Sequence, residues 1–184
     1  MIFVTVGTQL PFDRLVRSVD DWASSGKHEV FAQIGPSPYR PKHMAWARFV
    51  EADECRRRFE SASVIVAHAG MGSLITALEL GKPIVVMPRR ADLGEHRNDH
   101  QLATARRLVT QERAVVAFSE EELRGALDRI RDLRPAAACS SAASVRLVGA
   151  LRHFINHGRG TASASTLGQL GGEDHDLSLP DVAI

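Results

Sequence analysis

The sequence has 184 residues, and one domain is the default at this length because single domains most often have roughly 100–150 residues. Hydrophobic residues make up 44% and charged residues 24% of the chain, close to the averages for soluble globular proteins. The formal net charge of +1 gives no field suited to the wholesale capture of nucleic acid or of a membrane. Any ligand must therefore be recognised locally, and nucleic acid is not expected as a partner.

The cysteine content and the apolar runs indicate a reducing, cytoplasmic setting. Cys55 and Cys139 are too few for a disulfide framework and too far apart for a zinc-ligand pair. The first residues have strand character with no basic segment before them, so no signal peptide is predicted. No stretch reaches the roughly 20 apolar residues that a membrane-spanning helix needs. Contact with a membrane is therefore expected only through a partner.

Strand-like and helix-like segments alternate from the start of the chain. Residues 2–6 form a short apolar run, and Pro11 opens a segment with apolar residues at helical spacing. Residues 29–34 predict a second strand, which a loop containing three prolines follows. A weaker strand at 46–50 precedes a charged helix at 53–60.

The alternation continues through the second half of the chain. Buried-type strands are predicted at 63–67 and 84–88, separated by HAGMGS and a helix. A helix from about residue 98, the short strand AVVAF, and a helix capped by Ser119 with Glu122 three residues on complete the pattern. Regular alternation of this kind predicts an α/β fold with one right-handed, doubly wound parallel sheet.

The C-terminal part divides into a predicted helix and a predicted tail. A helix at about 140–156 is expected to pack on the preceding segments, which gives a domain of residues 1–157. Residues 158–184 are small, polar and rich in glycine and serine, a composition typical of disorder.

Three polar clusters follow strands at the sheet edge where ligands of open parallel sheets bind. They are residues 7–9, 68–73 and 89–101. In the first, Gly7 and the Thr8 hydroxyl could hold a phosphate oxygen, although a tight turn that simply needs glycine is an equal alternative.

The second cluster, HAGMGS, lies between a buried strand and a helix and is the most informative of the three. Gly70 and Gly72 would let the backbone approach a diphosphate while the helix N-terminus directs its partial positive charge at it. The segment lacks the GxGxxG and GxxxxGK[ST] patterns, which argues against a dinucleotide enzyme and a P-loop ATPase. His68 could donate to a phosphate or could only brace the turn, and the residues alone favour the brace slightly.

The third cluster, RRADLGEHRNDHQ, could neutralise phosphate charge and bind sugar hydroxyls, or could be a solvated charged loop. His96 and His100 have the i, i+4 spacing of zinc ligands. However, Arg97 replaces the glutamate of HExxH and no third ligand follows, so no metal site is predicted.

These motifs, taken in order, resemble a known family. MIFVTVGTQLPFDRLV, SASVIVAHAGMGSLITALELGKPIVVMPRR and GEHRNDHQLATA together resemble the C-terminal domain of glycosyltransferase family 28, over roughly residues 1–155. The resemblance is greatest to PssE-type subunits of bacterial exopolysaccharide assembly, and to the catalytic subunit of the eukaryotic dolichol-linked UDP-GlcNAc transferase. It implies one Rossmann-like lobe of the GT-B architecture, which binds the nucleotide sugar.

The resemblance also implies a set of donor-binding residues. Residues matching the family motifs are Gly7, Thr8, His68, Gly70, Gly72, Ser73, Asp99, His100 and Gln101. Thr76 stands where relatives often have a glutamate that binds the uridine ribose, with Glu79 one helical turn away. Ribose recognition is therefore the part of the site that the resemblance transfers least well.

The expected function is that of the donor-binding subunit of a two-chain inverting glycosyltransferase. Such an enzyme would transfer a hexosyl or hexuronosyl group from a UDP-sugar to a lipid-linked saccharide, in exopolysaccharide or capsule biosynthesis. The resemblance implies no cofactor or metal, and a membrane-anchored PssD-type partner that binds the acceptor and supplies the catalytic base. The catalytic residues are unassigned, with His68, Arg89 and Arg90 as candidates to stabilise the leaving diphosphate, aided by Ser73.

Two alternatives belong to other classes. A non-catalytic scaffold or activating subunit would keep the lobe but not the reaction, and the Thr76 departure keeps this possibility open. A nucleotide-sugar epimerase would need a dinucleotide fingerprint and a Tyr-x-x-x-Lys pair. The only tyrosine, Tyr39, does not begin such a pair, which argues against this alternative.

Overall fold

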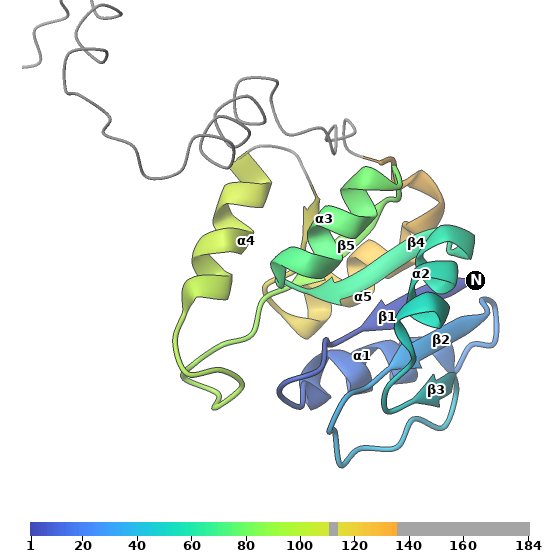
Figure 1. Ribbon diagram of the computed structural model, residues 1–184, viewed down its shortest axis with the longest axis horizontal. Helices are drawn as coiled ribbons and strands as arrows, with labels where there is room; N and C mark the ends of the chain where they lie inside the picture. Colours follow the sequence, from blue (N-terminus) through green and yellow to red (C-terminus); the bar gives the residue numbers. More distant parts are fainter. Residues whose placement is uncertain (111–113, 136–184) are drawn as a thin grey trace, which may run out of the picture. The chain divides into compact units, whose positions relative to one another are not determined.

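The strands form a single parallel sheet in the order β3-β2-β1-β4-β5-β6 (Figure 1). This computed structural model describes residues 1–110 and 114–135, all within the compact unit Met1–Ser141. The described strands are β1 (Ile2–Thr5), β2 (Val30–Gln33), β3 (Ala45–Ala47), β4 (Val64–His68), β5 (Ile84–Met87) and β6 (Val115–Val116). The predicted doubly wound parallel sheet is confirmed. The predicted helix at 140–156 and tail at 158–184 lie outside the described residues.

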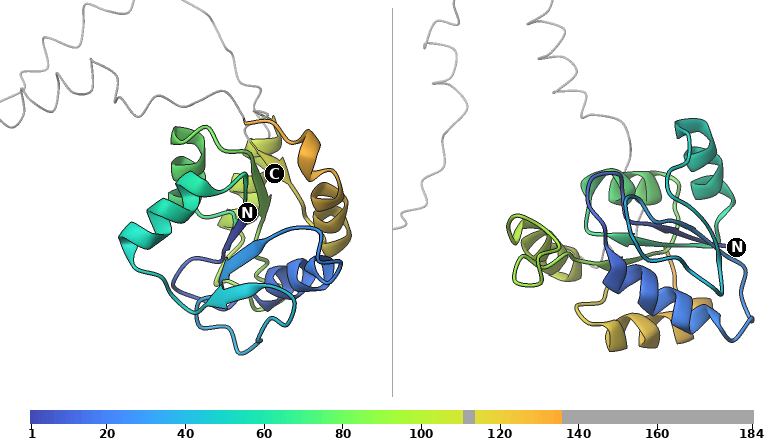
Figure 2. Two further views of the ribbon diagram at one scale, coloured as in Figure 1. Left: turned by 90° about the vertical axis from the view of Figure 1, so that its right-hand side faces the viewer. Right: turned by 90° about the horizontal axis from the view of Figure 1, so that it is seen from below.

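Helices cover both faces of the sheet. Figure 2 shows α1 and α5 against one face and α2 and α3 against the other. The described helices are α1 (Asp13–Ala23), α2 (Ala52–Ser61), α3 (Met71–Glu79), α4 (His100–Thr110), α5 (Glu120–Asp128) and the short 3-10 helix η1 (Ile130–Asp132). In the part of the chain that the structure describes, no helix is long and apolar enough to cross a membrane.

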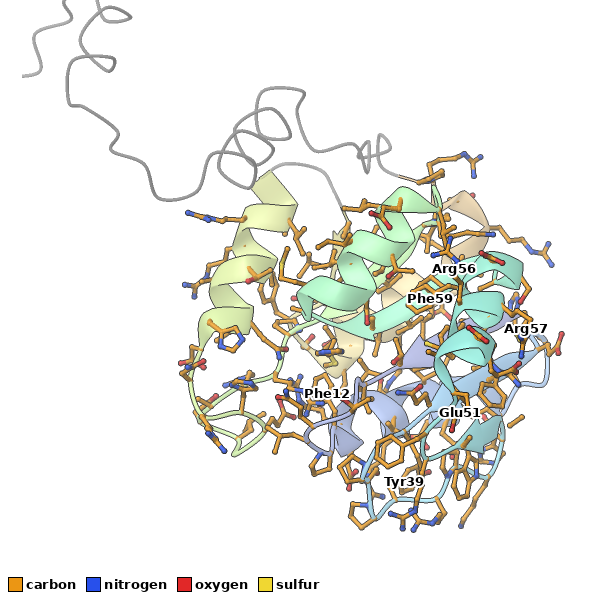
Figure 3. The ribbon with its side chains drawn as sticks, in the orientation of Figure 1. Phe12, Tyr39, Glu51, Arg56, Arg57 and Phe59 are labelled. Atoms are coloured by element: carbon orange, nitrogen blue, oxygen red, sulfur yellow. The ribbon has the colours of Figure 1, made fainter. Side chains whose placement is uncertain are left out.

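The alternation of side chains along each strand divides the core into two layers. Val4 and Val66 pack in the layer with α1 and α5, whereas Phe3 and Ile65 pack in the layer with α2 and α3. The ring of Phe3 meets that of Phe59, labelled on α2 in Figure 3, edge to face at a centroid distance of 5.2 Å. Because both sheet faces are covered, the strands are largely apolar, with polar residues such as Thr5, Gln33 and His68 at their carboxyl ends.

Side-chain caps set the starts of two helices. The Ser119 side chain accepts a hydrogen bond from the Glu122 amide at the start of α5, which confirms the predicted cap. Helix α4 begins at His100, two residues later than predicted. The side chain of Asn98 accepts a hydrogen bond from the His100 amide. The first helical backbone bond then runs from the Ala103 amide to the Asp99 carbonyl.

Asp20 on α1 fixes the proline-rich loop that follows β2. Its carboxylate is fully buried and accepts hydrogen bonds from the Tyr39 hydroxyl at 2.6 Å and the His43 amide at 2.7 Å. The Lys42 amide donates to the same carboxylate at 2.9 Å. Figure 3 shows Tyr39 at the lower border of the molecule, on this loop. The loop is therefore anchored although it contains no regular structure.

The strand order places a crevice beside β1 and β4. The chain winds outward in one direction from β1 to β2 and β3, and in the other from β4 to β5 and β6. Connections that leave neighbouring strands in opposite directions open a gap at the carboxyl ends of those strands. The loops after β1, β4 and β5 follow these carboxyl ends and lie toward the left of the molecule in Figure 1.

Candidate functional site

A pocket of about 500 Å³ opens at the carboxyl edge of the sheet. This volume is within the range of small-molecule sites. The lining residues come from the loops after β1, β4 and β5 and from the starts of α3 and α4, and are Val6, Gly7, Thr8, Gln9, Leu10, His68, Gly70, Met71, Gly72, Ser73, Arg89, His96, His100 and Gln101. The structure thus brings the three polar clusters of the sequence together in one place.

His68, at the end of β4, lies between two glycines of the pocket. A Cβ atom at Gly70 would be 2.1 Å from His68 Nε2, and one at Gly7 would be 2.8 Å from His68 Cε1. Gly7 also has a φ of 75°, a conformation that favours glycine. The sequence suggested that Gly70 and Gly72 let the backbone approach a ligand and that Gly7 forms a turn that could hold a phosphate. The structure shows that Gly7 and Gly70 make room for the imidazole, whereas a Cβ atom added at Gly72 would meet no other part of the structure within 4 Å.

The surroundings of His68 keep its imidazole neutral. Burial, with the nearby positive charge of Arg89 acting in the same direction, lowers the pKa of His68 to about 4. Its Nδ1 atom is buried and has no hydrogen-bond partner among the described residues. Without a ligand the imidazole is therefore uncharged at neutral pH, and in this form it can hydrogen-bond to an anion.

The N-terminus of α3 faces the same pocket and presents backbone donors. Gly70 is the N-cap and provides no side-chain cap, and the first intrahelical bond runs from the Leu74 amide to the Gly70 carbonyl at 3.2 Å. The amides of residues 71–73 come before this bond and have no acceptor within the helix. Together with the helix dipole, such amides form a ready binding site for a phosphate group.

The two arginines predicted to face the diphosphate lie in different environments. Arg89 lines the pocket but is only 2% exposed, and its guanidinium donates to backbone carbonyls. Burial lowers the pKa of Arg89 to about 10, which leaves it charged at neutral pH. Arg90 is not among the lining residues, and its guanidinium pairs with Asp92. The structure therefore does not place the pair side by side at the pocket.

Of three further predicted residues, one lines the pocket and two lie outside its lining. Gln101 lines the pocket and its side-chain oxygen accepts from the Arg89 amide at 3.1 Å. Thr76 lies outside the lining, and its hydroxyl donates to the Gly72 carbonyl one turn earlier at 2.9 Å. Asp99 is also outside it, and its carboxylate accepts from the Ala91 amide at 3.0 Å. Thr76 and Asp99 thus stabilise the helix and the loop that border the pocket.

Several lining residues were not assigned to the donor site from the sequence. Gln9 and Met71 belong to the clusters that the sequence singled out, so their position within those clusters could have identified them as site residues. His96 belongs to the third polar cluster but was named individually only as a possible metal ligand, and its ring packs edge to face on that of His100 at a centroid distance of 4.5 Å. Within residues 1–110 and 114–135, no three His, Cys, Asp or Glu side chains are grouped so that they could hold a metal ion.

Comparison with known proteins relates this chain to glycosyltransferases. The chain is 31% identical over 118 residues to the human UDP-N-acetylglucosamine transferase subunit ALG13, a match covering 58% of this chain and 10% of the human protein. This chain therefore spans about a tenth of the length of the curated relatives that it matches. The solution structure of ALG13 has a similar fold, with a TM-score of 0.53 and 18% identity over 74% of this chain and 89% of that one.

A second solved structure gives a comparable match. The calicheamicin glycosyltransferase CalG4 aligns with a TM-score of 0.59 and 15% identity, covering 85% of this chain and 43% of its own. At such identities the similarity shows the fold, a Rossmann-like lobe of the GT-B type. The model of the glycosyltransferase family 28 C-terminal domain matches residues 1–149. The chain therefore belongs to the glycosyltransferase family 28 C-terminal domain family.

Proposed function

We propose that this domain binds a UDP-sugar as the donor-binding catalytic subunit of an inverting glycosyltransferase. The observation that carries the proposal is that the glycine bends after β1 and β4 line one pocket together with the N-terminus of α3. Backbone amides at such bends and at a helix start are suited to a diphosphate. Family membership and the curated relative, which is named as a UDP-N-acetylglucosamine transferase subunit, support a UDP-sugar as the ligand.

The proposed reaction exchanges one bond at the anomeric carbon of the donor. The oxygen of an acceptor hydroxyl attacks this carbon from the face opposite the diphosphate, the bond to the diphosphate oxygen breaks, and UDP leaves with the electron pair. The amides at residues 71–73 and the Ser73 hydroxyl would stabilise the charge that develops on UDP. His68 would add a neutral hydrogen bond, and His100 with Gln101 would orient the sugar. No metal or cofactor is proposed.

We further propose that a second chain supplies the acceptor site and the base that takes the hydroxyl proton. The word "subunit" in the name of the curated relative supports this arrangement. By the resemblance to PssE-type subunits, the partner would be a membrane-anchored PssD-type protein and the acceptor a lipid-linked saccharide in exopolysaccharide or capsule biosynthesis. The domain would then act in the cytoplasm at the inner face of the membrane.

An activity assay on separate and combined chains tests this proposal. The chain and the product of a neighbouring PssD-type gene would be expressed alone and together, and each preparation incubated with radiolabelled UDP-sugars and membrane extract. The proposal predicts transfer of label to lipid only when both chains are present. Transfer by the partner alone would favour the alternative of a non-catalytic scaffold or activating subunit. The position of Thr76 outside the pocket lining favours testing that alternative in the same assay.

A further inference from the structure

We infer that Arg89 is a positioning residue, which holds the loop of residues 7–10 in its pocket-lining conformation and does not itself bind the diphosphate. The inference rests on the proposed function, because it assigns how the diphosphate pocket is kept in shape. It differs from the expectation drawn from the sequence, in which the charge of Arg89 offsets that of the leaving group.

The contacts of the guanidinium carry this inference. Nη2 donates to the carbonyl oxygens of Val6 and Leu10, both at 2.7 Å. Nη1 donates to the carbonyl oxygens of Pro11 and, at 3.4 Å, of Glu95. The four N–H groups on these two nitrogens are therefore matched by four carbonyl oxygens. Direct contact between these nitrogens and a phosphate would require breaking bonds that are already made.

The positions of the acceptors explain what the contacts achieve. Val6 precedes the glycine bend at Gly7, and Leu10 and Pro11 follow it, so one guanidinium holds both ends of the bend. The backbone amide of Arg89 is fixed in turn by the side-chain oxygen of Gln101 at 3.1 Å. The loop after β1 is thus tied to the loop after β5 and to the start of α4.

A second arginine, on α1, ties that helix to the same loop after β5. Arg14 pairs with the Glu95 carboxylate through two bonds, at 2.7 and 2.8 Å, and donates to the Pro88 carbonyl at 3.0 Å. The ring of Phe12 lies under both guanidinium groups, 4.7 Å from the Arg89 carbon Cζ and 5.4 Å from that of Arg14. Figure 3 shows Phe12 on the segment that joins β1 to α1. Phe12 is fully buried, so this group of side chains belongs to the interior.

Lysine cannot reproduce this arrangement although it carries the same charge. Its single nitrogen has three donors and no planar fork, so it cannot reach carbonyls on both sides of the bend at once. Leaving a buried carbonyl without its donor destabilises the arrangement, and we take the effect as about a tenfold change in an equilibrium constant, or about 1.4 kcal/mol. If Arg89 positions the loop, Arg89→Lys and Arg89→Gln should weaken UDP binding to a similar extent. If the charge of Arg89 contacts the diphosphate directly, only Arg89→Gln should weaken UDP binding.

Calorimetric titration of the full chain with UDP is the test, with thermal unfolding of each variant in parallel. We expect the Kd for UDP to rise about tenfold in both Arg89→Lys and Arg89→Gln. Tyr39→Phe is the matched control, because it removes a buried hydrogen bond on the loop after β2, away from the pocket lining. We expect this control to lower the Tm and leave the Kd unchanged, which separates lost positioning from lost stability.

Glu95→Gln provides a milder variant if Arg89→Lys does not fold. This substitution weakens the pair with Arg14 and leaves Arg89 in place. We therefore expect the Kd for UDP to rise about two- to threefold, which is less than the tenfold rise expected for the Arg89 variants. Hydrogen exchange at the amides of residues 7–10 is an independent readout without ligand, and it should be faster in the Arg89 and Glu95 variants than in wild type and Tyr39→Phe.

The outcomes distinguish this inference from the proposed function. An Arg89→Lys protein that binds UDP as wild type does, while Arg89→Gln does not, would show that the charge suffices and would overturn the inference alone. If Arg89→Lys does not fold, Glu95→Gln takes its place in the test. An unchanged Kd for UDP in Glu95→Gln would then also overturn the inference. If the wild-type chain binds no UDP, the proposed function fails, and unchanged exchange at residues 7–10 in the variants would then overturn the positioning role as well.

Discussion

The imidazole of His68 occupies the space in which a side chain at residue 70 would lie, since a Cβ there would be 2.1 Å from Nε2. Non-bonded atoms do not approach so closely, so Gly70→Ala must displace either the imidazole or the start of α3. Both are predicted to hold the diphosphate. We expect Gly70→Ala to raise the Kd for UDP about tenfold or more, as measured by calorimetric titration.

Gly125→Ala is the matched control for this substitution. Gly125 lies within α5, away from the pocket lining, and a Cβ there would meet no atom within 4 Å. Alanine is favoured over glycine inside a helix by about 0.5–1 kcal/mol. We therefore expect Gly125→Ala to raise the Tm and keep the wild-type Kd. If Gly125→Ala weakened UDP binding as much as Gly70→Ala, the contact with His68 would not be the cause.

The low pKa of His68 makes stability depend on pH. In the folded chain the pKa is about 4, below the ordinary value of 6.5, so the unfolded chain takes up the proton more readily. The stability that the neutral imidazole contributes is complete above pH 6.5 and is lost as the pH falls from 6.5 toward 4. The loss should reach about 2–3 kcal/mol in the free energy of unfolding.

Urea unfolding between pH 7.5 and 4.5 measures this effect. His68→Asn keeps a polar side chain but has no proton equilibrium in this range, so its stability should fall less steeply with decreasing pH than that of wild type. Because all other titrating groups are shared, the difference between the two slopes belongs to residue 68. Parallel slopes would show that His68 titrates normally in the folded protein.

Asp20 offers a prediction about stability that leaves binding unchanged. Burial alone would raise the pKa of Asp20, but hydrogen bonds from Tyr39 and from the amides of Lys42 and His43 outweigh it, so the pKa is lowered. The stability that this carboxylate contributes is thus present above its ordinary pKa of 3.8 and is lost as the pH falls below that value. At pH 7, Asp20→Ala should lower the free energy of unfolding by about 3 kcal/mol because three donors lose their acceptor.

Chemical denaturation and calorimetric titration of the same Asp20→Ala preparation check both parts of this prediction. The anchored loop lies outside the pocket lining, so the Kd for UDP should match that of wild type. A large loss of affinity would mean that the loop after β2 influences the pocket from a distance.

Much of the fold could be predicted from the sequence because its signals are local. Covered strands must be apolar throughout, as at residues 64–67, and turns and helix starts need particular residues such as Ser119. The meeting of the clusters after β1, β4 and β5 follows from a general property of parallel sheets, whose strands all end at one edge. For this reason the pocket could be located before its shape was known.

The partners of polar side chains at the pocket could not be predicted in the same way. An arginine in a polar loop can face a ligand or the carbonyls of another loop, and the sequence does not distinguish the buried Arg89 from Arg90, which pairs with Asp92. Thr76 and Asp99 also hydrogen-bond to nearby backbone groups. The contacts of Arg89 depend on the packing of segments far apart in the chain, since Val6 and Arg89 are 83 residues apart, whereas those of Arg90, Thr76 and Asp99 are with nearby residues.

The central claim is that the bends at Gly7 and Gly70, with His68 between them, form a diphosphate site, and titration of the full chain with UDP tests it most directly. Wild type should bind UDP, and both His68→Ala and Gln101→Ala should bind it about tenfold more weakly or worse, since each removes a side chain that lines the pocket. An affinity for UDP that stays the same in either variant would contradict the assignment of this site.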